Sequence, residues 1–160
     1  MPTPFDEVNN IFYDLVEADP EFFDYYGIDA SDSMQLAEMR ADSCLMQAAT
    51  KLALETNSDV DFSDFSAEER VFATDLTQEE KYLLARLQYQ QYLYRDFATL
   101  RAQATRFTSA EQTVFSPAND RKTFLAMYES LRAENTNLIN AYLWKDRATN
   151  SRKTLQYEDL

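Results

Sequence analysis

The sequence predicts an all-α fold, a helical bundle built around one long central helix. Apolar residues make up 45% of the 160 residues and aromatic residues 14%, enough to bury a core without metal or disulfide. A single glycine, Gly27, and four prolines argue against a sheet-rich fold, because sheets need turn glycines at short intervals. Apolar residues recur instead at three- and four-residue spacing, which is the period of a helix face.

The first predicted helix runs from Phe5 to Ala18. Its apolar positions at helical spacing are Val8, Ile11, Phe12, Leu15 and Val16. Asp19-Pro20 ends it, because the residue before a proline is pushed out of the helical region. A short aromatic helix is predicted after Pro20, with Gly27 as its C-terminal cap.

A long helix is predicted next, over residues 34–55, with its N-cap in the segment Ser31–Ser33. We expect its buried stripe to comprise Leu36, Met39, Leu45, Met46, Ala49, Leu52 and Ala53. Cys44 is the only cysteine and lies among apolar residues of this helix, so we expect a buried structural thiol.

Residues 57–76 predict a loop laid across the core, because isolated apolar residues alternate there with Asp and Ser. Ser66–Glu69 has the form of a capping box and predicts one or two helical turns over residues 68–73. Asp59, Asp61 and Asp64 alternate as in a calcium loop, but the glycine and the final glutamate of such a loop are missing.

The central helix is predicted over residues 78–107. Thr77–Glu80 is a capping box: the Thr77 hydroxyl can accept from the Glu80 backbone N–H, and the Glu80 carboxylate can accept from that of Thr77. Leu93, Phe97, Leu100, Ala104 and Phe107 form one face, and further apolar residues widen the stripe. Such a helix is packed on several sides.

A last long helix is predicted over residues 117–147, with Pro117 in its first turn. Its seam comprises Phe124, Tyr128, Leu131, Leu138 and Tyr142. Asn135 interrupts this seam, and it either fixes the register between subunits or lies at a poorly buried position. Residues 1–147 are therefore expected to form a single helical domain, and residues 148–160 an extended C-terminal arm.

The charge is distributed unevenly along the chain. Residues 1–80 hold 20 acidic and 3 basic side chains, a net charge of −17, whereas residues 81–160 hold 8 and 12, a net charge of +4. The asymmetry indicates either a solvated acidic face or head-to-tail complementarity between copies of the chain. It argues against an ordinary nucleic-acid-binding surface, which needs clustered Lys and Arg.

The composition disfavours catalysis. The chain has no histidine, which is the commonest general base and metal ligand, and one glycine leaves no phosphate-binding loop. We therefore expect no enzyme activity, no cofactor and no metal. The first residues do not predict a signal peptide and no apolar run is long enough to span a membrane, so we expect a soluble protein of a reducing cytoplasm.

Trp144 is the strongest candidate for partner binding. It lies next to Lys145 and Arg147 near a helix end, and is either an interface anchor or a core tryptophan whose basic neighbours complement the helix C-terminus. The candidate partner-binding residues are Trp144, Lys145, Arg147, Arg152, Lys153, Leu155 and Tyr157.

Two sequence blocks resemble small helical proteins of tailed bacteriophages. The first is Phe72–Glu80, Phe-Ala-Thr-Asp-Leu-Thr-Gln-Glu-Glu, running into the apolar central helix. The second is Phe115–Asn119, Phe-Ser-Pro-Ala-Asn, followed by a helix that ends near Tyr142. Together they span residues 72–150, about half of the chain, and their spacing is similar to that of the head-to-tail connector (neck or adaptor) family.

The resemblance implies a virion structural protein made in the host bacterial cytoplasm and placed in the neck. Such proteins form a homo-oligomeric ring of about a dozen copies beneath the portal. The implied partners are the portal, the next neck or tail protein, and genomic DNA that passes through the lumen without sequence-specific binding. Connector proteins commonly send a C-terminal arm into the portal, which fits residues 148–160.

A different class of function remains open from the composition. The acidic half of the chain fits a DNA-mimic inhibitor of a nucleic-acid enzyme, with carboxylates spaced like phosphates. Such a protein would be a monomer or dimer that binds a basic enzyme in a salt-dependent way. A third alternative is a helical scaffold protein without any connection to nucleic acid.

Overall fold

The computed structural model describes residues 1–16, 29–106 and 117–153, with the backbone alone over residues 96–106 and 117–121. The described chain is mostly helical with a small sheet, which is consistent with the predicted helical bundle. Its helices are α1 (Phe5–Val16), α2 (Ala30–Glu55), α3 (Gln78–Arg106) and α4 (Pro117–Leu143). None of them is long and apolar enough to cross a membrane. The short helix predicted after Pro20 falls outside the described residues.

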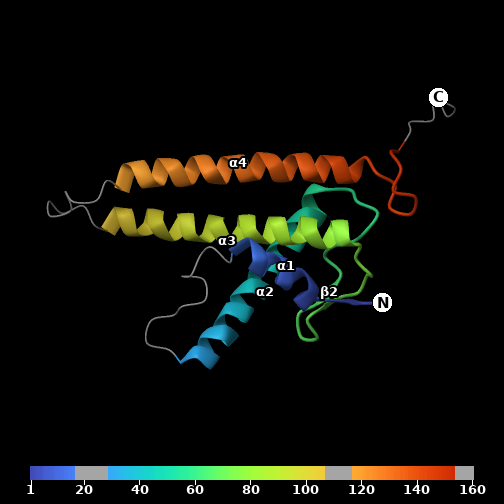
Figure 1. Cartoon of the computed structure of the whole chain (residues 1–160), viewed down its shortest axis with the longest axis horizontal. Helices are drawn as coiled ribbons and strands as arrows, with labels where there is room; N and C mark the ends of the chain where they lie inside the picture. Colours follow the sequence, from blue (N-terminus) through green and yellow to red (C-terminus); the bar gives the residue numbers. More distant parts are fainter. Residues whose placement is uncertain (17–28, 107–116, 154–160) are drawn as a thin grey trace.

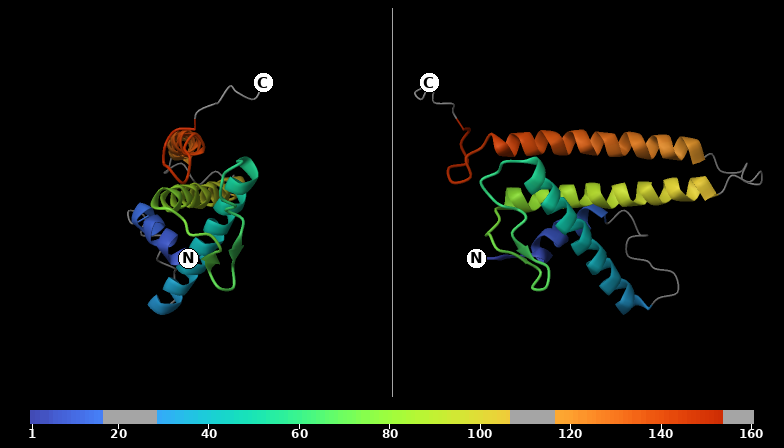
Figure 2. Two further views of the ribbon diagram at one scale, coloured as in Figure 1. Left: turned by 90° about the vertical axis from the view of Figure 1, so that its right-hand side faces the viewer. Right: turned by 180° about the vertical axis from the view of Figure 1, so that it is seen from behind.

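Helix α3 lies at the centre of the arrangement. It runs antiparallel to α4 along the long axis of the molecule, and α1 and α2 cross its other side (Figure 1). Seen from one end, α1 lies on the side of α3 away from α4, whereas α2 crosses α3 and its C-terminal end rises beside it towards α4 (Figure 2). The central helix therefore packs against three other helices, which confirms the prediction made from its wide apolar stripe.

A small antiparallel sheet, which the sequence did not predict, closes one end of the helices. Its strands are β1 (Thr3–Pro4), β2 (Phe65–Ser66) and β3 (Val71–Phe72), in the order β1-β3-β2. Thr3 and Phe65 pair with Phe72 from either side. The rings of Phe5, Phe65 and Phe72 pack together beneath it, with centroids 5.0 to 6.0 Å apart.

The helical turns predicted over residues 68–73 are wrong. The Glu69 N–H does donate to the Ser66 hydroxyl at 3.2 Å, as in a helix cap, but the chain then reverses through Arg70 in the left-handed region, with φ 55°. This tight turn lets β3 pair with β2, so that Phe72 reaches the aromatic cluster. Long-range packing has overridden the local capping signal.

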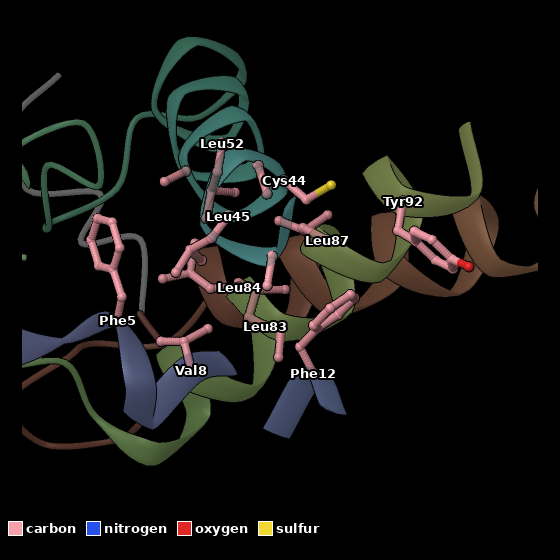
Figure 3. Close-up of a cluster of buried hydrophobic side chains, with 14 of the residues drawn as sticks. Phe5, Val8, Phe12, Cys44, Leu45, Leu52, Leu83, Leu84, Leu87 and Tyr92 are labelled. Atoms are coloured by element: carbon pink, nitrogen blue, oxygen red, sulfur yellow. The ribbon is translucent and has the colours of Figure 1, made fainter. Parts of the chain in front are cut away.

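Helix α2 packs on the core through small residues. Its buried side chains include Ala37, Ala41, Cys44, Leu45, Ala48, Ala49 and Leu52, and Figure 3 shows several of them facing Leu84 and Leu87 of α3. The buried thiol is confirmed. The predicted burial of Leu36 and Met39 is wrong, since they are 38% and 63% exposed. Alanines on the buried face of α2 allow it to approach α3 closely. The longer side chains of Leu36 and Met39 therefore lie on the exposed face.

Helix α4 contacts α3 through one seam. Asn135 is only 1% exposed; its amide donates to the Arg86 carbonyl oxygen at 3.2 Å and to Gln90 Oε1 at 2.8 Å. The poorly buried alternative is therefore wrong, and these bonds fix the register between two helices of one chain. Leu138, predicted in the seam, is 37% exposed, and the neighbouring Ile139 packs there instead.

A buried polar network joins α1, α2 and α3. Gln88 Nε2 donates to Asn9 Oδ1 at 2.9 Å and to the Ala41 carbonyl oxygen at 3.0 Å. Asn9 in turn donates to Asp42, whose carboxylate accepts from Arg70 Nε at 2.7 Å. Because Arg70 lies in the turn between β2 and β3, the network also ties the sheet to the helices.

We predict that Leu93→Asp unfolds or strongly destabilises the protein. Leu93 is 5% exposed on α3, so the substitution combines a lost apolar contact with a buried charge, at a cost of more than about 3 kcal/mol. Leu54→Asp is the matched control, because Leu54 is 82% exposed and should change the unfolding free energy by less than about 0.5 kcal/mol. Urea denaturation of the two variants compares them, and equal midpoints would contradict the assigned core.

Candidate interaction site at the base of the central helix

A short hairpin follows α4, which ends at Leu143 rather than at the predicted residue 147. We call residues 144–153 the C-terminal hairpin. The Lys153 N–H donates to the Trp144 carbonyl oxygen, and the Asp146 N–H to that of Ser151, both at 2.8 Å. Residues 148–153 of the predicted arm are therefore folded back along residues 144–147.

The turn of this hairpin is held by Asp146. Its carboxylate accepts from the Thr149 N–H at 2.8 Å, from the Thr149 hydroxyl at 2.8 Å and from the Ala148 N–H at 3.1 Å. The bonds from Thr149 hold the pKa of Asp146 below its ordinary value. Asn150 takes the left-handed conformation with φ 53°, which asparagine tolerates better than most residues.

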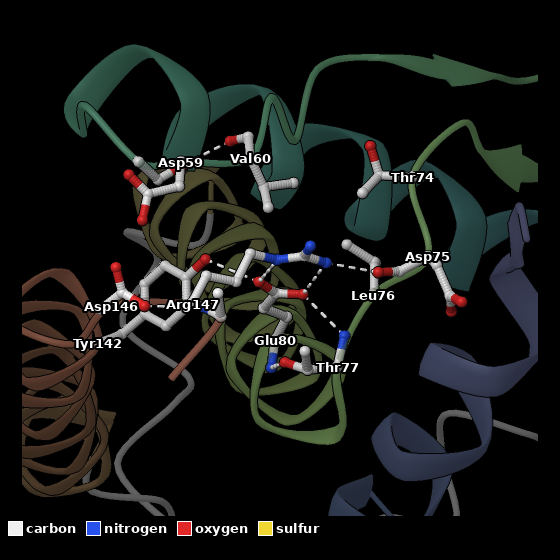
Figure 4. A network of polar contacts seen from close by, with 12 residues as sticks. Asp59, Val60, Thr74, Asp75, Leu76, Thr77, Glu80, Tyr142, Asp146 and Arg147 are labelled. Carbon is white, nitrogen blue, oxygen red and sulfur yellow. Dashed lines mark hydrogen bonds and ion pairs between the residues drawn. The ribbon is translucent and has the colours of Figure 1, made fainter. Parts of the chain in front are cut away.

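Glu80 lies where the hairpin meets the first turn of α3. The predicted capping box is present: the Thr77 N–H donates to Glu80 Oε2 at 2.7 Å, and the Glu80 N–H to the Thr77 hydroxyl at 3.3 Å. The same carboxylate also accepts from Arg147 Nε at 2.7 Å and from the Tyr142 hydroxyl at 2.8 Å (Figure 4). We call Thr77, Glu80, Tyr142 and Arg147 the anchor site.

The anchor site keeps Glu80 ionised although its side chain is completely buried. Burial alone would raise the pKa of this carboxyl, but the hydrogen bonds from Arg147, Thr77 and Tyr142 outweigh it and hold the pKa below its ordinary value. Burial and the bond to Glu80 raise the pKa of Tyr142, so its hydroxyl remains a donor. Arg147 Nη2 also donates to the Asp75 carbonyl oxygen, and thereby holds the segment before α3.

Further ion pairs join the two halves of the chain. Basic side chains from residues 81–160 contact acidic side chains from residues 1–80 in the pairs Lys81–Glu7, Lys145–Glu79, Arg147–Glu80 and Lys153–Asp59, with N–O distances of 2.5 to 3.1 Å. Part of the acidic first half is thus neutralised by the basic second half of the same chain. The composition had suggested a solvated acidic face or complementarity between copies, but not ion pairing within one chain.

The predicted partner-binding residues therefore fall into three groups. Lys145, Arg147 and Lys153 hold the hairpin against the rest of the chain. Trp144 is 60% exposed, so the interpretation as a core tryptophan is wrong, and Arg152 is exposed without an ion pair to the residues that the structure describes. Leu155 and Tyr157 lie outside those residues.

Sequence reasoning missed Tyr142 and Arg147 as partners of Glu80. The capping box follows from a local pattern, whereas these contacts join residues 62 and 67 positions apart. The only available signal was that Tyr142 and Arg147 lie near the predicted end of the last long helix.

The chemistry of the anchor site suits attachment of one segment to another. A carboxylate that is ionised, buried and fully bonded is a poor proton donor or acceptor near neutral pH. Within the described chain, no group of three His, Cys, Asp or Glu residues could hold a metal ion. Asp59 pairs with Lys153, and Asp61 accepts the backbone N–H and the hydroxyl of Ser63.

Comparison with protein-family models, with curated proteins and with solved structures gives no match for this chain.

We predict that Glu80→Gln lowers the unfolding free energy at pH 7 by about 2 kcal/mol, because the charge-assisted bonds to Arg147 are lost. The ionised carboxylate stabilises the fold fully above its unfolded pKa of about 4.3 and loses this effect as pH falls through its lower native pKa. The gap between wild type and variant should therefore narrow below about pH 4.

Denaturant unfolding at several pH values measures this gap. Lys145→Gln serves as the control, since the half-exposed Lys145–Glu79 pair should contribute less than about 1 kcal/mol. A Glu80→Gln effect that is no larger than the control, or that does not change with pH, would contradict the role assigned to Glu80.

Proposed function

We propose that this chain is a virion structural protein, a head-to-tail connector (adaptor) that forms a ring under the portal of a tailed bacteriophage. The observation that carries the proposal is Trp144, which is 60% exposed on a hairpin held rigidly against the base of α3. An exposed tryptophan on an immobilised segment is the side chain most suited to anchor a protein partner, because little conformational freedom is lost on binding.

The resemblance to connector proteins supports the proposal through residues that have a defined role in the fold. In the first block, Phe72 and Leu76 are buried, and Thr77 and Glu80 form the cap of α3. This block therefore builds the corner against which the C-terminal hairpin is held. The second block begins α4, at residues whose side chains are not described.

The proposed partner surface is narrower than the seven residues that the sequence indicated. Lys145, Arg147 and Lys153 are already paired within the chain, so they position the hairpin. Trp144 and Arg152 are the described side chains left to contact the portal. A net charge of −13 further suits a channel protein, because a negative lumen would repel DNA and let it slide.

The alternative, a DNA-mimic inhibitor, needs many free carboxylates on one surface. At least nine of the acidic side chains in residues 1–80 instead form ion pairs within the described chain. Asp6, Glu38 and Asp42, for example, all surround Arg70. The acidic surface is thus partly neutralised, which favours the connector.

The function is tested by labelling intact particles. We expect a gold-tagged antibody against the protein to bind at the junction of head and tail in virions purified from a lysate that contains it, seen by electron microscopy. Unlabelled particles from a lysate in which the protein is abundant would contradict the connector function and favour the acidic inhibitor.

We predict that Trp144→Ala weakens attachment to the portal by about 30-fold or more, as loss of an interface hot spot of at least about 2 kcal/mol requires. Folding should change by less than about 1 kcal/mol, because the side chain is largely exposed. Tyr82→Ala is the matched control, an exposed aromatic on α3. Equal binding of the two variants to purified portal would exclude Trp144 as the anchor.

A further inference from the structure

A hollow of about 90 Å³ lies where the C-terminal half of α2 meets α3 and α4. Figure 2 shows this end of α2 rising beside α3 towards α4. The buried side chains of Leu52 and Leu87 line the hollow, together with the charged side chains of Lys51, Glu55 and Arg132. None of these residues belongs to the anchor site or to the C-terminal hairpin, so the hollow is separate from the proposed portal contact.

Gln90 of α3 brings unused hydrogen-bond donors to this hollow. It lines the hollow and is only 4% exposed. Arg86 Nε donates to Asn135 Oδ1 at 3.1 Å, and Asn135 Nδ2 donates to Gln90 Oε1 at 2.8 Å. This chain of bonds fixes which end of the Gln90 amide is its oxygen. Gln90 Nε2 is left with two N–H donors and has no hydrogen-bond partner among the described residues.

The free nitrogen of Gln90 is accessible from the hollow. Within the part of the chain that the structure describes, the only completely buried side-chain nitrogen or oxygen without a partner is Gln88 Oε1. Gln90 Nε2 is therefore not sealed off inside the protein, and the hollow that Gln90 lines is where it can be reached. A largely buried donor is costly to leave without a partner, so we expect water or a ligand to satisfy it.

The charged side chains around the hollow leave one net positive charge for a ligand. Lys51 and Arg132 are cationic, and Glu55 is the single anionic residue of the lining. Lys51 Nζ lies 3.9 Å from the Glu55 carboxylate, at the limit of an ion pair. Arg132 is exposed and has no ion pair in the described chain, although acidic residues outnumber basic ones by 28 to 15. Its charge is therefore available to an outside anion.

These properties favour a carboxylate as the ligand. Gln90 Nε2, Lys51 and Arg132 are all donors, and a guanidinium matches the two oxygens of a carboxylate. The single charge of a carboxylate also equals the net charge of the lining, whereas a phosphate group carries about 1.5 to 2 charges at pH 7. One water needs about 10 to 15 Å³ of such volume. The hollow therefore has room for a carboxylate and the carbon that bears it.

We infer that this hollow between α2, α3 and α4 is a binding site for a carboxylate, held by Gln90, Lys51 and Arg132. Gln90 donates from the buried side, and Lys51 and Arg132 supply charge from the more exposed side. The neighbouring apolar side chains strengthen these bonds, because they lower the local dielectric constant. The carboxylate belongs to a free small acid or to an acidic side chain of a protein. The site does not depend on the connector function.

Sodium acetate is the probe of this site, and the full-length ¹⁵N-labelled protein reports its binding by NMR at pH 7. We expect the side-chain N–H signals of Gln90 to move downfield and to saturate. Acetamide is the matched control, because it has nearly the same shape without the charge, and sodium chloride controls for ionic strength. A shift that does not saturate, or that acetamide or chloride reproduces, would show that water alone fills the hollow and would overturn the inference.

Arg132→Gln should weaken acetate binding by about tenfold or more, because a charge-assisted hydrogen bond is lost. The fold should be unchanged, since the exposed guanidinium has no ion pair in the described chain. Arg152→Gln removes the same charge from an exposed arginine outside the hollow, and should change the affinity by less than about twofold. Equal affinities of the two variants would contradict the site.

Gln90→Glu is a second variant that keeps the oxygen to which Asn135 donates but replaces the free donor with an acceptor. We expect it to abolish acetate binding, read from the backbone N–H signal of Gln91, which also lines the hollow. Acetate that still binds to a folded Gln90→Glu protein with unchanged affinity would exclude Gln90 as the donor and overturn the inference.

Two further probes identify the source of the carboxylate. If acetyl-glutamyl-glutamyl amide binds about tenfold tighter than acetate or more, the site takes an acidic side chain of a protein; equal or weaker binding assigns it to a free small acid. Either result supports a carboxylate site, whereas inorganic phosphate that binds more tightly than acetate would overturn it. Label at the neck of virions tests the connector function separately and leaves this site unaffected.

Discussion

The buried carboxylate of Glu80 is the interaction on which the rest of the structure depends. It caps the first turn of α3, accepts from Tyr142 at the end of α4, and pairs with Arg147 in the C-terminal hairpin. A buried carboxylate is tolerated only when its lone pairs are filled. Its four described donor groups satisfy that condition, so the start of α3, the end of α4 and the hairpin are fixed at one point.

This constraint explains how the chain uses its uneven charge. The acidic first half and the mildly basic second half meet in ion pairs around the base of α3 and beside α1. Exposed pairs of this kind contribute little stability individually, but they select the docked position of the hairpin. Trp144 is thereby presented to solvent at a defined place.

Local patterns could be predicted from the sequence, whereas the contacts between residues far apart in the chain could not. The Thr77–Glu80 capping box is confirmed, since its bonds span three residues. The same type of pattern at Ser66–Glu69 failed, because the aromatic cluster of Phe5, Phe65 and Phe72 favours paired strands. Periodicity located helix α2, but only packing decides that its alanines face the core and Met39 does not. The Glu80–Arg147 contact depends on the tertiary fold alone.

A double-mutant cycle between Glu80 and Arg147 tests the central claim most directly. The unfolding free energies of wild type, Glu80→Gln, Arg147→Gln and the double variant would be measured at neutral pH. A direct buried contact predicts a coupling energy of about 1.5 to 3 kcal/mol, with the double variant little worse than either single one. Additive effects, with a coupling energy near zero, would show that the hairpin is not held to α3 through this carboxylate.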